Sequence, residues 1–173
     1  EEPIISGERG SGTVFFCGCN LNCIFCQNYK INHSVMGIEA DEETLCRIML
    51  DLQHQGAHNI NLVTPAPHVP LIARTLPLAR QAGLTIPVVY NTNAYENVQT
   101  LKMLEGLIDI YLPDFKYVSA PLAKKYSDAE DYFAIAAQAI AEMYRQVGNI
   151  KLDENGMAVS GVLIRHMVLP GCV

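Results

Sequence analysis

The sequence predicts an α/β fold built on a parallel sheet, in one domain that covers residues 1–173. Short apolar segments of strand length alternate along the chain with longer segments of helical periodicity. Of the 173 residues, 50% are hydrophobic and 17% are charged, so the chain can bury a sizeable core. No repeat or linker divides it. The pattern fits either an open doubly wound sheet or part of a (β/α) barrel.

Five segments are predicted as strands, because each is short, apolar and followed by residues that favour a turn. They are residues 13–17, 59–63, 86–90, 108–112 and 161–169. In both candidate architectures the carboxyl ends of parallel strands meet at one edge, where active sites lie. The polar segments that follow the strands are therefore expected to converge there. These segments are residues 19–26, 64, 91–93, 114–116 and 166–170.

Four segments between the strands are predicted as helices: residues 41–55, 70–82, 96–105 and 127–147. Acidic residues at 41–43 suit the positive end of the first helix, and Gly56 can end it. Pro70 fits the first turn of the second helix, while Pro77 inside that helix predicts a kink.

The last predicted helix begins with Ser127-Asp-Ala-Glu130, which has the form of a capping box. Its apolar stripe, expected in the core, is formed by Tyr132, Phe133, Ile140 and Met143. Residues 1–12 are predicted as a leading loop, and residues 153–156 as the turn of a small hairpin.

The charge and cysteine content argue against several classes of protein. The formal net charge is −6, and the Lys and Arg residues are scattered, so we expect no nucleic acid partner. No apolar segment approaches the roughly 20 residues that span a bilayer, so we expect no membrane insertion. The acidic first residues lack a signal-peptide profile, and the clustered cysteines fit a reducing compartment better than a disulfide scaffold. A cytoplasmic location is therefore predicted.

The most specific chemical signal is the loop Cys19-Asn-Leu-Asn-Cys23-Ile-Phe-Cys26. Three thiolates at this spacing can hold three irons of a [4Fe-4S] cluster and leave the fourth iron without a protein ligand. Two alternatives stay open on spacing alone. A structural zinc site needs four ligands, and an electron-transfer cluster needs a fourth cysteine. The candidates for that fourth cysteine are Cys17, Cys46 and Cys172.

Residues 15–28, with the aromatic Phe25 directly before the third cysteine, resemble the signature loop of the radical S-adenosylmethionine (SAM) superfamily. Other segments narrow the resemblance to the activating-enzyme family related to pyruvate formate-lyase activase. These segments are residues 4–12, 59–65, 88–92, 109–117 and 164–171. The resemblance covers almost the whole chain.

This resemblance implies a partial (β/α)6 barrel of the radical SAM type, which in this chain would be truncated after its fifth strand. It implies that Cys19, Cys23 and Cys26 hold a [4Fe-4S] cluster whose remaining iron chelates SAM. One electron, from a flavodoxin- or ferredoxin-type reductant, then cleaves SAM to methionine and a 5′-deoxyadenosyl radical. The radical abstracts hydrogen from a substrate, which in the activases is a glycine of a partner glycyl-radical enzyme.

The resemblance also implies which residues contact SAM. They are Phe25, Thr64, Asn91, Thr92, Asn93, Asp114, Lys116 and Arg165. Two positions depart from the common pattern. Thr64-Pro65 stands where Gly-Gly-Glu is common, and Asn91 stands where activases carry the Asp of a small monovalent-cation site. Three alternative functions remain: a radical SAM enzyme with a small-molecule substrate, a non-catalytic iron–sulfur electron carrier, and a zinc-binding module.

Overall fold

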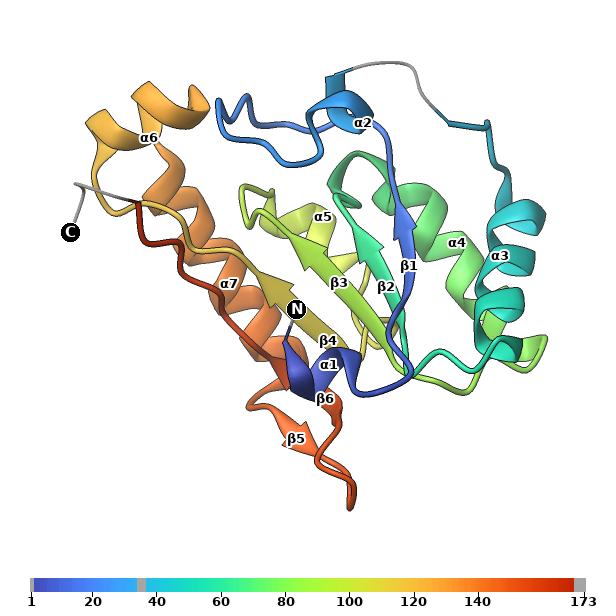
Figure 1. Ribbon diagram of the computed structural model, residues 1–173. Helices are drawn as coiled ribbons and strands as arrows, with labels where there is room; N and C mark the ends of the chain where they lie inside the picture. Colours follow the sequence, from blue (N-terminus) through green and yellow to red (C-terminus); the bar gives the residue numbers. More distant parts are fainter. Residues whose placement is uncertain (1, 34–36, 170–173) are drawn as a thin grey trace.

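The computed structural model describes residues 2–33 and 37–169, and these form one six-stranded sheet with its helices (Figure 1). The strands are β1 (Gly12–Phe15), β2 (Ile60–Val63), β3 (Val88–Thr92), β4 (Ile110–Pro113), β5 (Lys151–Leu152) and β6 (Ala158–Val162). The helices are α1 (Pro3–Ser6), α2 (Tyr29–His33), α3 (Glu42–His54), the 3-10 turn η1 (Ala66–His68), α4 (Val69–Gln81), α5 (Val98–Lys102), α6 (Ala120–Ser127) and α7 (Tyr132–Val147). The α/β class is therefore confirmed.

The strands follow the order β1-β2-β3-β4-β6-β5, and the first five in this order are parallel. A doubly wound sheet reverses its strand order at a switch point. Among the described residues the five parallel strands follow one another in chain order without such a reversal, which favours the barrel-like alternative over the doubly wound one. Only β5 is antiparallel, and it forms with β6 the small hairpin that the turn at 153–156 predicted.

The register brings the carboxyl ends of the parallel strands to a common level. Phe15 is paired with Val63, and Val63 with Asn91. Beyond β4 and β6 the ladder continues as a parallel bridge between Asp114 and Arg165. The segments that follow the strands consequently meet at one rim, as the sequence predicted.

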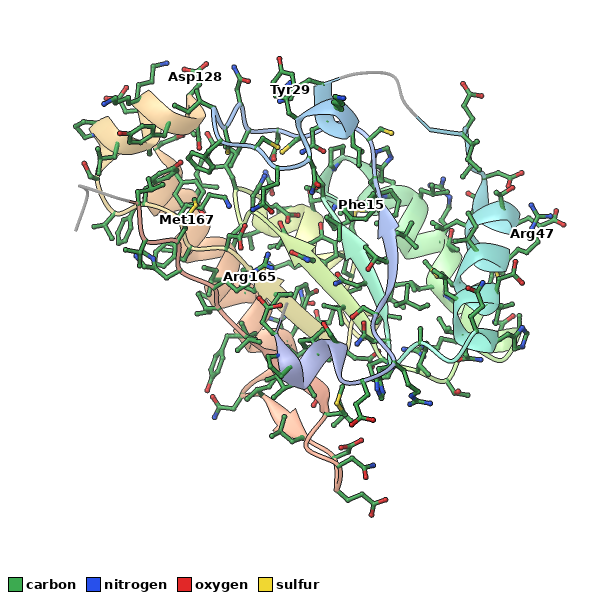
Figure 2. All side chains as sticks on the ribbon, in the orientation of Figure 1. Phe15, Tyr29, Arg47, Asp128, Arg165 and Met167 are labelled. Carbon is green, nitrogen blue, oxygen red and sulfur yellow. The ribbon has the colours of Figure 1, made fainter. Side chains whose placement is uncertain are left out.

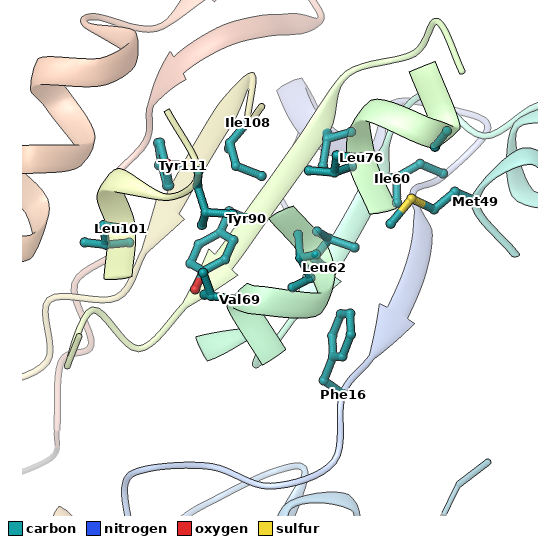
Figure 3. Close-up of a cluster of buried hydrophobic side chains, with 14 of the residues drawn as sticks. Phe16, Met49, Ile60, Leu62, Val69, Leu76, Tyr90, Leu101, Ile108 and Tyr111 are labelled. Carbon is teal, nitrogen blue, oxygen red and sulfur yellow. The ribbon is translucent and has the colours of Figure 1, made fainter. Parts of the chain in front are cut away.

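The two faces of the sheet have different surroundings. On one face Leu62 and Tyr90 are fully buried with residues of α3, α4, α5 and α7, and they form the main hydrophobic cluster (Figure 3). Burial of this kind stabilises the fold by about 25 cal/mol for each Å² of apolar surface. Alternate residues such as Thr13, Asn61 and Asn91 point to the opposite face, where they line a cavity.

Several element boundaries differ from the predictions. The first twelve residues are not only a loop, because Pro3–Ser6 form α1, whose Ile5 packs against β3 and β4. The helices α2 and α6 were not predicted. The third and fourth strands lie about two residues later than expected, and the last strand spans Ala158–Val162 instead of residues 161–169. The chain continues past Pro77 within α4.

The predicted capping box is wrong. Ser127 is the last residue of α6, and Asp128 adopts a left-handed conformation (φ 55°) that ends that helix. The next helix, α7, begins after Asp131, which makes no capping hydrogen bond with its side chain. The Ser127 hydroxyl is instead buried against Tyr117 and Cys23, so a tertiary contact has replaced the local one.

The apolar stripe of α7 is confirmed in part. Tyr132 and Met143 are fully buried, but Phe133 is 44% exposed and stacks on Phe115, with ring centroids 5.5 Å apart.

Within residues 2–33 and 37–169, no helix is long and apolar enough to cross a membrane.

Candidate metal and cofactor site

A cavity of about 770 Å³ lies on the open face of the sheet at the carboxyl ends of its strands. Figure 2 shows Phe15 on β1 and Arg165 beyond β6, which line it from the two sides of the parallel sheet. Every residue predicted from the sequence as a cluster or SAM ligand also lines it. These are Cys19, Cys23, Phe25, Cys26, Thr64, Asn91, Thr92, Asn93, Asp114, Lys116 and Arg165.

The cysteine loop rests on the carboxyl end of α6. The amide of Asn22 donates to the carbonyl of Ser127 (3.2 Å), and the amide of Ile24 donates to the carbonyl of Tyr126 (3.0 Å). The last carbonyls of a helix have no partner within the helix. Here the loop supplies partners for two of them, so α6 acts as the support for the loop.

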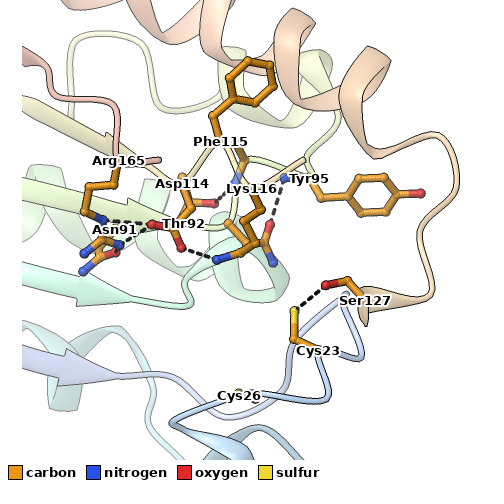
Figure 4. A network of polar contacts seen from close by, with 12 residues as sticks. Cys23, Cys26, Asn91, Thr92, Tyr95, Asp114, Phe115, Lys116, Ser127 and Arg165 are labelled. Carbon is orange, nitrogen blue, oxygen red and sulfur yellow. Dashed lines mark hydrogen bonds and ion pairs between the residues drawn. The ribbon is translucent and has the colours of Figure 1, made fainter. Parts of the chain in front are cut away.

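Each cysteine sulfur of the loop accepts a hydrogen bond from a different segment. Asn93 Nδ2 lies 3.4 Å from Cys19 Sγ, Ser127 Oγ lies 2.9 Å from Cys23 Sγ, and Asn32 Nδ2 lies 3.3 Å from Cys26 Sγ. Figure 4 shows the contact between Ser127 and Cys23. Burial raises the pKa of the Cys23 thiol, while the bond from Ser127 and the charge of Lys116 lower it.

The cysteines fit an iron–sulfur cluster better than a single metal ion. Cys19, Cys23 and Cys26 are free thiols that share one cavity, and polar hydrogens already point at their sulfurs. Among the residues that the structure describes, no three His, Cys, Asp or Glu side chains are placed to bind one ion. In a four-iron cluster each cysteine binds a different iron, so the three cysteines need not converge on a single ion.

Neither of the two described candidates for a fourth cysteine ligand lines the cavity. Cys46 packs against the main hydrophobic cluster, and Cys17 does not line the cavity. Cys172 lies outside the described residues. The described part of the chain thus offers three cysteines to a cluster at this site.

A network of charges forms the wall of the cavity beyond β4 (Figure 4). Asp114 accepts from Lys116 Nζ (2.5 Å) and from Arg165 Nε (2.9 Å), and it is therefore shared by two cations. Arg165 also donates to Asn91 Oδ1 (2.6 Å) and pairs with Glu2 at 3.4 Å. Two carboxylates, Asp114 and Glu2, therefore balance the charges of Lys116 and Arg165, and an anionic ligand would compete with these carboxylates for the cationic donors.

Other polar atoms of the cavity wall are not satisfied by the protein. Ser11 Oγ, Asn32 Oδ1 and Asn61 Oδ1 are buried and have no hydrogen-bond partner in the structure. Thr64, at the end of β2, has φ 58°, which is unusual for a β-branched residue. Unpaired polar atoms and backbone strain both concentrate at functional sites. Sequence reasoning did not predict Ser11, Asn32, Asn61 or Ser127 as site residues, and it assigned Ser127 to a capping box instead.

A buried carboxyl group stabilises the turn after β3 through hydrogen bonds. Glu96 is 6% exposed and accepts from Tyr90 OH (2.7 Å) and from Thr92 Oγ1, which in turn accepts from the amide of Ala94. These hydrogen bonds fix the turn that contains Asn93, whose side chain donates to Cys19 Sγ. Burial raises the pKa of Glu96, and the bonds from Thr92 and Tyr90 offset that only in part.

Glu96 is therefore expected to make folding stability depend on pH. A carboxyl group whose pKa is raised in the folded state stabilises the fold fully below its unfolded pKa, about 4.3, and loses this contribution as pH rises through the folded pKa. The Glu96→Gln variant lacks the titrating group. Denaturant unfolding of both proteins should show the variant gaining stability relative to wild type as pH rises above about 4.3, the unfolded pKa of a glutamate. A difference that is constant with pH would contradict this account.

Comparison with known proteins agrees with this reading of the cysteines. A family model described as a 4Fe-4S single cluster domain matches residues 5–127. The chain belongs to the 4Fe-4S single cluster domain family. The part matched to this family contains the cysteine loop, the charged wall at Asp114 and Lys116, and Ser127. A [4Fe-4S] cluster is thus supported by the family as well as by the site.

A relative from Methanocaldococcus jannaschii, an uncharacterized protein, is 31% identical over 169 residues. The match covers 92% of this chain and 45% of the relative. This chain therefore spans less than half the length of that relative. The similarity extends beyond the matched family segment to include most of the sheet and α7.

Proposed function

We propose that this protein is a radical SAM enzyme whose described sheet is part of a (β/α)6 barrel of that superfamily, in a single core domain. The observation that carries the proposal is the convergence of three free cysteines and a charged, polar wall on one cavity of about 770 Å³. The sequential parallel order of β1 to β4 and β6 supports the barrel.

In this proposal Cys19, Cys23 and Cys26 each hold one iron of the cluster. A cluster held by these cysteines would supply the electron needed for reductive cleavage of SAM. The chain's own residues bind and orient SAM, because the hard chemistry belongs to the cofactor. Lys116 and Arg165 are suited to the SAM carboxylate by their charge.

The remaining contacts are assigned by their chemistry. Asn91 and Asp114 carry acceptor oxygens for the ammonium group or the ribose hydroxyls, as do Thr92, Asn93 and Thr64. Phe25 lines the cavity and lies 6.5 Å from the ring of Tyr126, in a position to pack against the adenine. The substrate we favour is a backbone glycine of a partner enzyme, as in the activases that the sequence resembles, with flavodoxin or ferredoxin as reductant.

The test is SAM cleavage by the protein after anaerobic reconstitution and reduction. We expect release of 5′-deoxyadenosine and a change in the EPR spectrum of the reduced cluster when SAM is added. A reducible cluster that neither binds nor cleaves SAM would instead indicate an electron carrier, and zinc in place of iron and sulfide would indicate an interaction module. A glycyl EPR doublet on a partner protein would identify the substrate class, while hydrogen abstraction only from a small molecule would overturn the activase assignment.

A further inference from the structure

Two buried hydroxyl groups lie in a line that ends on one of the cysteine sulfurs. Tyr117 OH is 2.7 Å from Ser127 Oγ, and Ser127 Oγ is 2.9 Å from Cys23 Sγ. Tyr117 is 3% exposed and Ser127 is 1% exposed, so water does not compete for these bonds. We call Tyr117, Ser127 and Cys23 the hydroxyl relay.

The direction of both bonds follows from counting protons. A cysteine that binds iron is a thiolate, so its sulfur can only accept, and Ser127 must donate its one proton to Cys23. Ser127 then has no proton left for Tyr117, so Tyr117 must donate to Ser127. Burial supports this order because it raises the pKa of Tyr117 to about 12 and keeps that hydroxyl protonated. Hydrogen bonds in a chain polarise one another, so the bond from Tyr117 to Ser127 strengthens the bond from Ser127 to Cys23.

We propose that the hydroxyl relay raises the reduction potential of the cluster, and so makes the cluster easier to reduce. Reduction adds negative charge that is shared by the ligand sulfurs, and a donor aimed at a sulfur stabilises the reduced state more than the oxidised one. The inference rests on the part of the proposed function that places the cluster on Cys23. It does not depend on SAM or on any substrate.

The relay is not needed merely to hold the loop in place. Asn22 and Ile24 already tie the cysteine loop to the end of α6 through backbone hydrogen bonds, which a change of the Ser127 side chain leaves intact. Tyr117 does not contact the loop through a hydrogen bond of its own and reaches Cys23 through Ser127. Ser127 and Tyr117 therefore act through Cys23, and we expect them to change the reduction potential of the cluster without changing the position of the loop.

The experiment is a redox titration of reconstituted wild type, Ser127→Ala, Tyr117→Phe and the double variant, followed by EPR and absorbance. At the wild-type midpoint we expect Ser127→Ala to lower the ratio of reduced to oxidised cluster about threefold, or roughly 28 mV at about 59 mV per tenfold for a one-electron couple. Tyr117→Phe should shift it in the same direction by less. The double variant should match Ser127→Ala, because Tyr117 acts only through Ser127.

The matched control is Ser119→Ala, which removes a hydroxyl at the other end of α6 that makes no capping hydrogen bond. It should leave the potential unchanged.

Iron and sulfide are counted in every sample. A normal iron content with an unshifted potential in Ser127→Ala would overturn the proposal, and so would additive shifts in the double variant. Loss of iron from Ser127→Ala with no shift in Tyr117→Phe would assign Ser127 to holding the loop and would likewise overturn it. Failure of SAM cleavage with the expected shifts would defeat only the radical SAM assignment.

Discussion

Replacing Cys23 with alanine is expected to reduce the iron kept after anaerobic reconstitution from about four atoms per chain to near background. Cys23 is the middle cysteine of the loop, and its sulfur lines the cavity next to Ser127. Two cysteines alone anchor a four-iron cluster weakly, and among the described residues the cavity is lined by no cysteine other than Cys19, Cys23 and Cys26 that could replace the lost ligand. The measurement is iron and acid-labile sulfide per chain, together with the visible absorbance of the cluster.

The matched control for that variant is Cys46→Ala. Cys46 is also a half-buried free thiol, but it packs against the main hydrophobic cluster from α3. Its replacement should leave the iron content unchanged. Equal iron in the two variants would remove the cysteine loop as the site of the cluster.

Replacing Asp114 with alanine is expected to lower the free energy of unfolding by about 1–3 kcal/mol, because Asp114 and Lys116 form a partly buried ion pair and the loss of one partner leaves the other uncompensated. Lys116 has only 12% of its side chain exposed and would lose its partner at 2.5 Å. Arg165 is 33% exposed and would lose the same partner while keeping Asn91 and Glu2. Denaturant unfolding of the apoprotein measures the loss without any contribution from the cluster.

Glu42→Ala provides the comparison for Asp114. Glu42 accepts from Arg74 at 2.6 Å, but the arginine side chain is 61% exposed, and exposed ion pairs contribute roughly 0–1 kcal/mol. We therefore expect a much smaller loss from Glu42→Ala. If both variants lose equally little, Asp114 does not hold the charged wall together.

The elements that the sequence predicted well are those with a strong local pattern. The helix at Glu42–His54 has Asp41 as an N-cap whose side chain accepts from the amide of Thr44, and it was predicted within a residue at each end. The parallel direction of the strands and the convergence of their ends also followed from the alternation of apolar and helical segments, whereas the strand order did not. These features depend on neighbours in the chain, so a pattern of a few residues is enough to find them.

The elements that escaped prediction depend on contacts between distant segments. The helix Ala120–Ser127 is only eight residues long, and its end is completed by amides of the cysteine loop. Ser127 fits a capping box locally, yet it is drawn into the contact with Cys23, which lies 104 residues earlier in the chain. Phe133 follows the apolar period of α7 but finds its partner in Phe115 near the surface.

The candidate site could be predicted as a set of residues but not as an arrangement. Motifs and strand ends located the cysteines, Asp114, Lys116 and Arg165. Arg165 reaches Asp114 from 51 residues away, and the donors that face Cys19 and Cys23 lie 74 and 104 residues from them in sequence, so these contacts appear only in three dimensions.

The separation of the two faces of the sheet bears on how this protein can diversify. Leu62 and Tyr90 belong to the layer under the helices, whereas Thr13 and Asn61, one residue away from buried neighbours, belong to the cavity. A change on the cavity side alters what the molecule accommodates without opening a void beneath the helices. Under the proposed function, substitutions confined to Thr13, Asn61 and Val63 would change what the cavity accommodates on a chain that still folds.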